Sequence, residues 1–450
     1  MTSIFPVEML LVVGIGAPAM LLIVLGGTSL ANRPLPERWT GRLAAGSMTA
    51  SFAALVVALV LLPTGPGAAH VSYGAWSTSH DGGIAIEFLL DATSLGFAVL
   101  ATAIAGVVAA FSNRYLHREP GYNRYFVLFA MFVTGILFVA LAGNVEVLFA
   151  GWEFVGLSSA LLVAFFHGRA GPVGNALRVF AVYRISDAAM LAAAVWLHHV
   201  AGSGSLSMLF GESGTVPQTG LAGADATIIA VLLIVAVAGK SALLPFSGWL
   251  PRAMEGPTPS SAVYYGALSI HAGCILLLRA TPLLEQVLAA RLLAGGIGAA
   301  TALFATVTTR VQSDVKSSLA YASLTQVGII IVEIALGLRA IAFLHLVGHA
   351  CFRLLQFLSA PNVLHDLHGL EDAIGVSPAH GGRPAPVAAP RVHRRLFLFA
   401  LERGFLDAML DRVFVTPFHR IASAFDRFDR LQCDVVASRT VTAEDTIHDD

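Results

Sequence analysis

The chain has 450 residues, of which 56% are apolar and only 12% are charged, and its mean hydropathy is +0.76. An ordinary soluble domain carries about 25% charged residues, and so little charge cannot cover this much apolar surface in water. Lipid is therefore the expected solvent, which excludes soluble enzymes, nucleic-acid-binding proteins and disordered scaffolds. The formal net charge of -1 gives no sign of a polyanionic partner.

Apolar runs recur along most of the chain. A helix that crosses the hydrocarbon core needs about 20 apolar residues, and the sequence predicts an all-α polytopic membrane protein with eleven such helices. They fall at 7–30, 41–63, 87–112, 125–143, 146–167, 179–201, 226–247, 258–280, 292–309, 317–338 and 340–360. The first is expected to be retained, because it lacks a basic leading segment and a small-residue cleavage site.

Basic residues indicate the orientation of these helices. Cytoplasmic loops are enriched in arginine and lysine, and alternate predicted loops hold twelve basic residues against three on the other side. The N-terminus is therefore expected outside and the C-terminus in the cytoplasm, in a bacterial inner membrane. Only two of the 27 basic residues are lysine, Lys240 and Lys316. Lysine, unlike arginine, is able to lose its proton when it is buried.

The chain after about residue 361 has a different composition. Residues 376–392 are rich in proline, glycine and alanine and predict a linker. Residues 393–432 mix apolar and charged positions at helical spacing, which favours an amphipathic helix on a surface or a partner. The last dozen residues are polar and expected to be disordered. The predicted division is 1–84 for the first helices, 85–365 for a conducting domain, 366–392 for a linker and 393–450 for a cytoplasmic tail.

Two ionisable residues lie deep inside predicted spans. Glu153 is in the fifth helix and Lys240 is fourteen residues into the seventh. Ionisable groups at bilayer depth are costly and mark an ion path or a partner contact. A nearby carboxylate would keep a buried ammonium charged, so the two groups are expected to titrate as a coupled pair, as a proton carrier requires. The alternative is a buried ion pair that only fixes helix register.

The eleventh helix carries His345, His349 and Arg353 at intervals of four residues, which places them on one face. Histidine titrates near neutral pH, so this stripe favours a proton relay. Two alternatives are structural histidines and a metal site. The metal reading is weakened by the lack of an HExxH pattern or a third ligand.

Other polar residues and prolines interrupt the spans. Arg184 and Asp187 lie one turn apart in the sixth helix, as a local ion pair would, while His271 and Glu333 lie in the eighth and tenth. All four are candidate residues of the proton pathway. A proline inside a span frees a carbonyl and breaks the helix, and broken helices line polar cavities in transporters. The prolines expected to break helices near Lys240 are Pro245, Pro257 and Pro259.

The motifs AGWEFVGLSSALLVAF, GKSALLPFSGWLPRAMEGPTPSSA, QSDVKSSLAYASLTQVG and HLVGHACFRLLQFL occur in this order. Over about residues 85–365 the chain resembles the antiporter-like subunits of respiratory complex I, notably subunit L, and of Mrp-type antiporters. The resemblance implies two inverted repeats of five helices, each with a broken helix and a half-channel. By position, Glu153 resembles the modulating glutamate, Lys240 the proton-carrying lysine of the first half-channel, and Arg184 with Asp187 a pair usual in the sixth helix. His345 and His349 resemble the central relay.

The sequence departs from this family pattern in its second half. The histidine usual after GPTP is here Tyr265, with His271 six residues further on, and the lysine after the histidine pair is Arg353, which cannot deprotonate. Two helices of the second repeat, the lysine of the twelfth helix and a long lateral helix are not found. A truncated second repeat is therefore expected, with the first half-channel intact.

These departures, together with YYGALSIHAG and the arginine-rich tail, resemble the DabB branch, the membrane subunit of an energy-coupled inorganic-carbon pump. That resemblance implies a large soluble partner like a zinc carbonic anhydrase (DabA type), docked on the tail. The alternatives are a subunit L-like proton pump among other complex I-like subunits and an Mrp-type antiporter. Protons are favoured over Na⁺ as the ion.

A chain without GxGxxG after a strand and without CxxC is expected to bind no cofactor and to be no redox enzyme by itself. No catalytic residue, metal or nucleic acid is expected either. The competing class of function is a non-conducting membrane anchor, in which the polar groups only fix helix register.

Overall fold

A computed structural model of the protein describes residues 5–62, 69–77, 84–207, 221–312, 314–374 and 390–445. Within them, eleven helices are long and apolar enough to cross a membrane, and each matches one predicted span. The prediction of an all-α polytopic membrane protein is thus confirmed, although a small β-hairpin is added to it. The chain forms two compact units, Met1–Gly404 and Phe405–Asp450.

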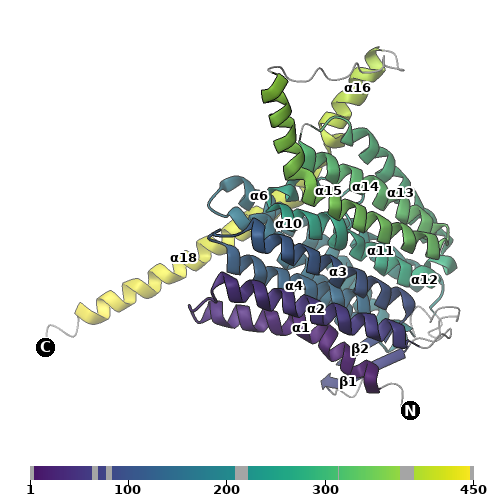
Figure 1. Ribbon diagram of the computed structural model, residues 1–450, viewed down its shortest axis with the longest axis horizontal. Helices are drawn as coiled ribbons and strands as arrows, with labels where there is room; N and C mark the ends of the chain where they lie inside the picture. Colours follow the sequence, from purple (N-terminus) through teal and green to yellow (C-terminus); the bar gives the residue numbers. More distant parts are fainter. Residues whose placement is uncertain are drawn as a thin grey trace. The chain divides into compact units, whose positions relative to one another are not determined.

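The first unit is a bundle of long helices packed side by side (Figure 1). Ten spans contain one long helix each: α1 (Phe5–Leu30), α2 (Glu37–Leu61), α3 (Ala92–Tyr115), α4 (Tyr122–Leu141), α5 (Val145–Val163), α6 (Ala170–Ala201), α8 (Gly223–Lys240), α13 (Leu288–Thr309), α14 (Val315–Ala335) and α15 (Arg339–Ile374). The eighth span is composite, with α10 (Thr258–Ser260), the π-helical stretch η3 (Ser261–Leu268) and α11 (Ser269–Arg279).

The composite span is the centre of the bundle. Its most apolar window is entirely buried, whereas only 33% of the corresponding window of α13 is buried. Peripheral helices leave large apolar side chains exposed, among them Leu292, Leu303 and Leu344. Such faces are stable in hydrocarbon and not in water, so the burial pattern fits a membrane-embedded bundle.

A β-hairpin precedes the third span. Strands β1 (Ala69–Ser77) and β2 (Ile84–Leu90) pair antiparallel, whereas the sequence predicts no strand between the spans 41–63 and 87–112 and a helix from residue 87. The helix instead begins at Ala92, because Asp91 and Ser94 form a reciprocal capping box at its N-terminus. Residues 63–68 and 78–83 lie outside the described residues.

The seventh span is interrupted near its C-terminal end, which is predicted to face the cytoplasm. Helix α8 ends at Lys240, seven residues before the predicted boundary, and the chain continues irregularly through Pro245 to α9 (Trp249–Arg252) and η2 (Ala253–Glu255). Pro257 is the N-cap residue of α10, and Pro259 lies in its first turn. Pro245 thus lies in the irregular segment after α8, whereas Pro257 and Pro259 lie at the N-terminal end of the composite span.

Two side chains satisfy backbone groups that the break exposes. The Leu244 backbone N–H donates to Thr301 Oγ1 on α13 at 3.0 Å, and Trp249 Nε1–H donates to the Gly239 carbonyl at 3.0 Å. Backbone polar groups at membrane depth require protein partners because no bulk water reaches them. These two bonds allow the helix to stop inside the bundle.

The C-terminal part is more helical than predicted. Helix α15 continues to Ile374, beyond the predicted span 340–360. A drop in hydropathy marks the end of a membrane span, but the helix itself can continue past it. Helix α16 (Pro390–Leu401) closes the first unit. The predicted linker lies largely outside the described residues, at 375–389.

The second unit is built from consecutive helical segments: α17 (Leu406–Leu410), η5 (Asp411–Val415) and α18 (Thr416–Asp445). Helix α18 covers part of the tail that was expected to be disordered. It exposes Ile421, Phe425 and Phe428, which lie on one helical face at spacings of four and three residues.

Helices α13 and α14 approach so closely that two glycines touch. A Cβ on Gly328 would lie 2.6 Å from the Gly298 carbonyl oxygen, and one on Gly298 would lie 2.8 Å from the Gly328 oxygen. Because backbone atoms cannot move aside as a side chain does, we expect Gly328→Ala to destabilise the protein by about 1–3 kcal/mol. The thermal midpoint in detergent measures this effect.

The matched control is Gly296→Ala on α13, where a Cβ would meet nothing within 4 Å. Alanine at an open helical position is expected to be neutral or mildly stabilising. Equal midpoints for Gly328→Ala and Gly296→Ala would contradict the close approach of the two helices.

Candidate functional site

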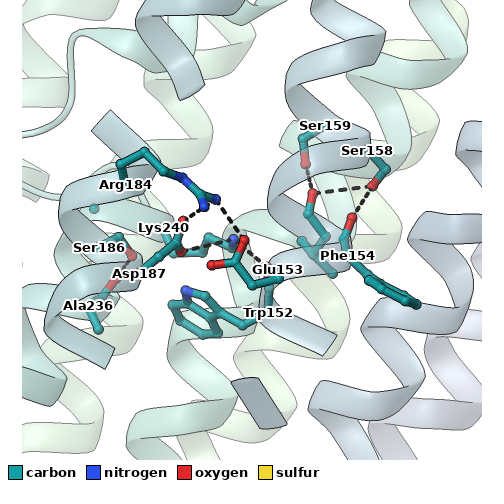
Figure 2. Close-up of polar contacts among 12 residues, drawn as sticks. Trp152, Glu153, Phe154, Ser158, Ser159, Arg184, Ser186, Asp187, Ala236 and Lys240 are labelled. Carbon is teal, nitrogen blue, oxygen red and sulfur yellow. Dashed lines mark hydrogen bonds and ion pairs between the residues drawn. The ribbon is translucent and has the colours of Figure 1, made fainter. Parts of the chain in front are cut away.

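Four ionisable side chains from three helices meet in one cluster (Figure 2). Arg184 Nη2 on α6 lies 2.8 Å from Glu153 Oε2 on α5 and 2.6 Å from Asp187 Oδ2 on its own helix. Lys240 Nζ, at the end of α8, lies 3.9 Å from Asp187 Oδ1. The guanidinium thus joins the two carboxylates, and the ammonium faces the carboxylate that Arg184 also holds.

The Lys240 ammonium is completely buried. It donates a hydrogen bond of 2.7 Å to the Trp152 carbonyl and lies 5.0 Å and 4.6 Å from the ring centroids of Trp152 and Tyr183. A cation over aromatic faces is stabilised by the negative potential of the rings. These contacts replace hydration, and only Asp187 offers a counter-charge within ion-pair distance among the described residues.

Accessibility changes along the cluster. The side chains of Arg184 and Glu153 are 35% and 28% exposed, whereas those of Asp187 and Lys240 are 4% and 0% exposed. In the described part of the chain, neither Asp187 oxygen accepts an aligned hydrogen bond, so this carboxylate is held mainly by the two cations. The cluster therefore leads from an accessible end at Glu153 to an enclosed end at Lys240.

Small residues make room for the ammonium. A Cβ on Gly156 of α5 would lie 2.8 Å from Lys240 Nζ, and one on Gly239 would lie 2.7 Å from Ser186 Cβ. Ser186 donates to the Ala236 carbonyl at 2.6 Å, which ties α6 to α8 beside the cluster (Figure 2). Glycine at these positions is what lets the three helices approach closely enough to enclose Lys240.

The predicted histidines form two further groups. His349 on α15 bonds to His271 on α11 at 2.9 Å and accepts from Arg353 Nε at 3.2 Å. His345 instead lies 3.0 Å from Glu333 Oε1 on α14, and its ring centroid is 6.5 Å from that of His349. The structure thus brings all five of these predicted residues together in neighbouring groups.

Tyr183 connects the lysine cluster towards the histidines. Its ring lies beside Lys240, and its buried hydroxyl, like that of Ser269, has no hydrogen-bond partner among the described residues. Ser269 stands two residues before His271 on α11. A line of polar groups therefore leads from Lys240 towards His271, although no direct contact joins those two residues among the described interactions.

The sequence indicates Glu153, Lys240, Arg184 and Asp187 as pathway residues, but it pairs Glu153 with Lys240 directly and does not place the other two between them. It gives no role to Trp152, Tyr183 and Gly156, which enclose the ammonium. A glycine or aromatic residue inside an apolar helix carries no distinctive pattern, so only the packing of α5 against α6 and α8 reveals these roles. Gln326 and Gln356, which contact His345 and Arg353, were missed for the same reason.

Comparison with known families identifies the fold. Residues 142–376 match the family described as NADH:quinone oxidoreductase/Mrp antiporter, TM, and residues 76–126 match the N-terminus of NADH-ubiquinone oxidoreductase (complex I) chain 5. The chain belongs to the NADH:quinone oxidoreductase/Mrp antiporter family. The match contains every cluster residue described above.

Individual relatives agree with this assignment. NADH-ubiquinone oxidoreductase chain 5 of Loxodonta africana is 32% identical over 329 residues, which cover 72% of this chain and 52% of the relative. Chain 5 of Schizophyllum commune is 33% identical over 302 residues, covering 67% and 43%. The chain thus spans about half the length of the curated relatives it matches.

Two solved structures share this fold. A chain of the Mrp complex from Dietzia sp. DQ12-45-1b superposes with a TM-score of 0.67 and 28% identity, over 84% of this chain and 39% of that one. A chain of the archaeal membrane-bound sulfane sulfur reductase gives 0.68 with 18% identity, over 90% and 87%. The second likeness, at that identity, concerns the fold alone.

The Gly156 contact gives a test of the enclosed ammonium. We expect Gly156→Ala to push Lys240 Nζ away from the Trp152 carbonyl, because a Cβ there would lie 2.8 Å from the nitrogen. The thermal midpoint in detergent should fall, because a buried ammonium without its carbonyl partner destabilises the folded state. Gly174→Ala on α6, where a Cβ meets nothing within 4 Å, should leave the midpoint unchanged. Equal midpoints in the two variants would refute the contact.

Proposed function

We propose that this chain is a proton-conducting membrane subunit of a multi-subunit, energy-coupled complex of the complex I or Mrp type. The observation that carries this proposal is the buried Lys240, which faces Asp187 at the end of a broken helix. A lysine in this position is able to gain and lose a proton inside the bundle, as a carrier must.

The arrangement of charges supports proton transfer between the two ends of the cluster. Arg184 contacts both Glu153 and Asp187, so a shift of its guanidinium towards one carboxylate weakens its hold on the other. A shift towards Glu153 strengthens the attraction between Asp187 and Lys240, and a shift towards Asp187 weakens it. Interacting sites of this kind titrate together, so proton occupancy at Lys240 responds to events at Glu153.

The proposed path continues from Lys240 past Tyr183 and Ser269 to His271, and on to the α15 groups. Protons are the proposed ion because lysine and histidine carry protons and do not coordinate Na⁺. The N-terminus is proposed to lie outside and the C-terminus in the cytoplasm of a bacterial inner membrane, from the arginine distribution.

The relatives favour one type of complex over another. Both matched families and the curated relatives are of the complex I chain 5 and Mrp type, which supports a redox-driven pump or an Mrp-type antiporter as the setting. The inorganic-carbon pump with a zinc-binding, carbonic-anhydrase-like partner rests on YYGALSIHAG and the tail sequence, and these comparisons lend it no support. It remains the second proposal.

Replacing the proposed carrier tests the function directly. We expect Lys240→Met to reduce coupled proton transport to the level of protein-free vesicles, because methionine fills a similar volume without a titratable group. Transport is measured as pH-gradient formation in proteoliposomes or inverted membranes. Glu285→Gln, at a surface pair with Arg339, provides the control and should transport normally. Wild-type flux in an assembled Lys240→Met complex would exclude Lys240 as the carrier.

The identity of the complex is tested by mild purification from native membranes. We expect quinone-reducing, hydrogenase-like or further antiporter subunits to co-purify, and mass spectrometry identifies them. A large zinc-binding soluble subunit would instead establish the inorganic-carbon pump.

An activity that is driven by the proton gradient should stop when an uncoupler collapses that gradient. The activity of a redox pump should instead become faster, because the pump no longer works against the gradient. Indifference to the uncoupler would indicate a non-conducting anchor.

A further inference from the structure

A continuous chain of hydrogen bonds runs from α15 to α11. Arg353 Nε lies 3.2 Å from His349 Nε2, His349 Nδ1 lies 2.9 Å from His271 Nε2, and His271 Nδ1 lies 2.6 Å from the Ala267 carbonyl oxygen. His271 is completely buried, and His349 and Arg353 are 6% and 7% exposed. Both nitrogens of both imidazole rings are therefore engaged.

The two ends of this chain fix where every proton lies. A guanidinium only donates, so His349 Nε2 must accept, and the ring carries its proton on Nδ1. That Nδ1–H donates to His271 Nε2, which must then be an acceptor as well. His271 carries its own proton on Nδ1 and donates it to the Ala267 carbonyl, which only accepts. A single arrangement satisfies all three bonds, with both histidines neutral and protonated on Nδ1.

We propose that Arg353 is a positioning residue that holds the His349–His271 pair in this arrangement and closes it to an incoming proton. An added proton needs a free ring lone pair, and Arg353 occupies the one on His349 Nε2. The pair opens when the guanidinium withdraws from that nitrogen. The proposed proton path gives this gate its role in transport, but the arrangement of protons itself does not depend on that function.

The surroundings of Arg353 make its position well defined. Its Nη1 donates to Gln356 Oε1 at 2.6 Å, and among the described residues no carboxylate forms an ion pair with it. The other titratable group near His349 on α15 is His345, whose Nδ1 is bonded to Glu333. Among the residues whose side chains are described, Arg353 thus has no ion-pair partner that would draw it from His349, and Gln356 anchors its far side.

Nitrogen-15 NMR of the histidine rings in the full-length protein in lipid tests the proposal. The Gly348–His349 pair is the only Gly–His sequence in the chain, so selective labelling with glycine and histidine assigns the His349 signals. In the wild-type protein we expect Nδ1 protonated and Nε2 unprotonated throughout about pH 5 to 8, where histidine ordinarily titrates. A protonated His349 Nε2 at neutral pH would overturn the proposal without any variant being needed.

Arg353→Met removes the donor and leaves an apolar side chain of similar length. We expect His349 Nε2 in this variant to take up a proton within the same pH range. Arg339→Met removes an arginine from the other end of α15, where it pairs with Glu285, and should behave as wild type. Identical His349 titrations in folded Arg353→Met and wild-type protein would show that Arg353 does not control the pair. Neither result depends on whether Lys240 carries protons.

Discussion

The need to satisfy buried charge and backbone without bulk water governs this structure. Lys240 stands where α8 stops, and its ammonium is held by a carbonyl, two aromatic rings and one carboxylate. A hydrated lysine would need none of these neighbours. Inside the bundle each of them offsets part of the desolvation penalty, so the ammonium is held without bulk water.

The same constraint explains why the surroundings of the two buried cations, Lys240 and Arg353, differ. Around Lys240, a counter-charge and an accessible outer carboxylate accompany a group that is able to deprotonate. Around Arg353, a permanently charged guanidinium is bonded to a neutral imidazole and an amide. The first arrangement suits exchange of a proton, and the second suits fixing the orientation of neighbouring rings. The two buried cations are therefore proposed to have different chemical roles.

The sequence was sufficient for the spans and for the residue types of the site, because hydropathy and isolated charges inside apolar runs are strong local patterns. It failed at the β-hairpin, because Ile84–Leu90 is apolar except for Glu87 and shows no alternation, so residues 87–90 were assigned to the following apolar run. It also paired Glu153 with Lys240 directly. The roles of Arg184 and Asp187 between them, and of Gly156 beside them, depend on the distance between helices, which no single segment encodes.

The Thr301 hydroxyl has a mechanical consequence. It belongs to α13, a helix at the rim of the bundle, and it accepts the Leu244 N–H four residues after Lys240. Any displacement of α13 would therefore move the acceptor of this bond and, with it, the unwound segment that follows α8. The Thr301 hydroxyl thus connects a peripheral helix to the segment that follows the buried Lys240.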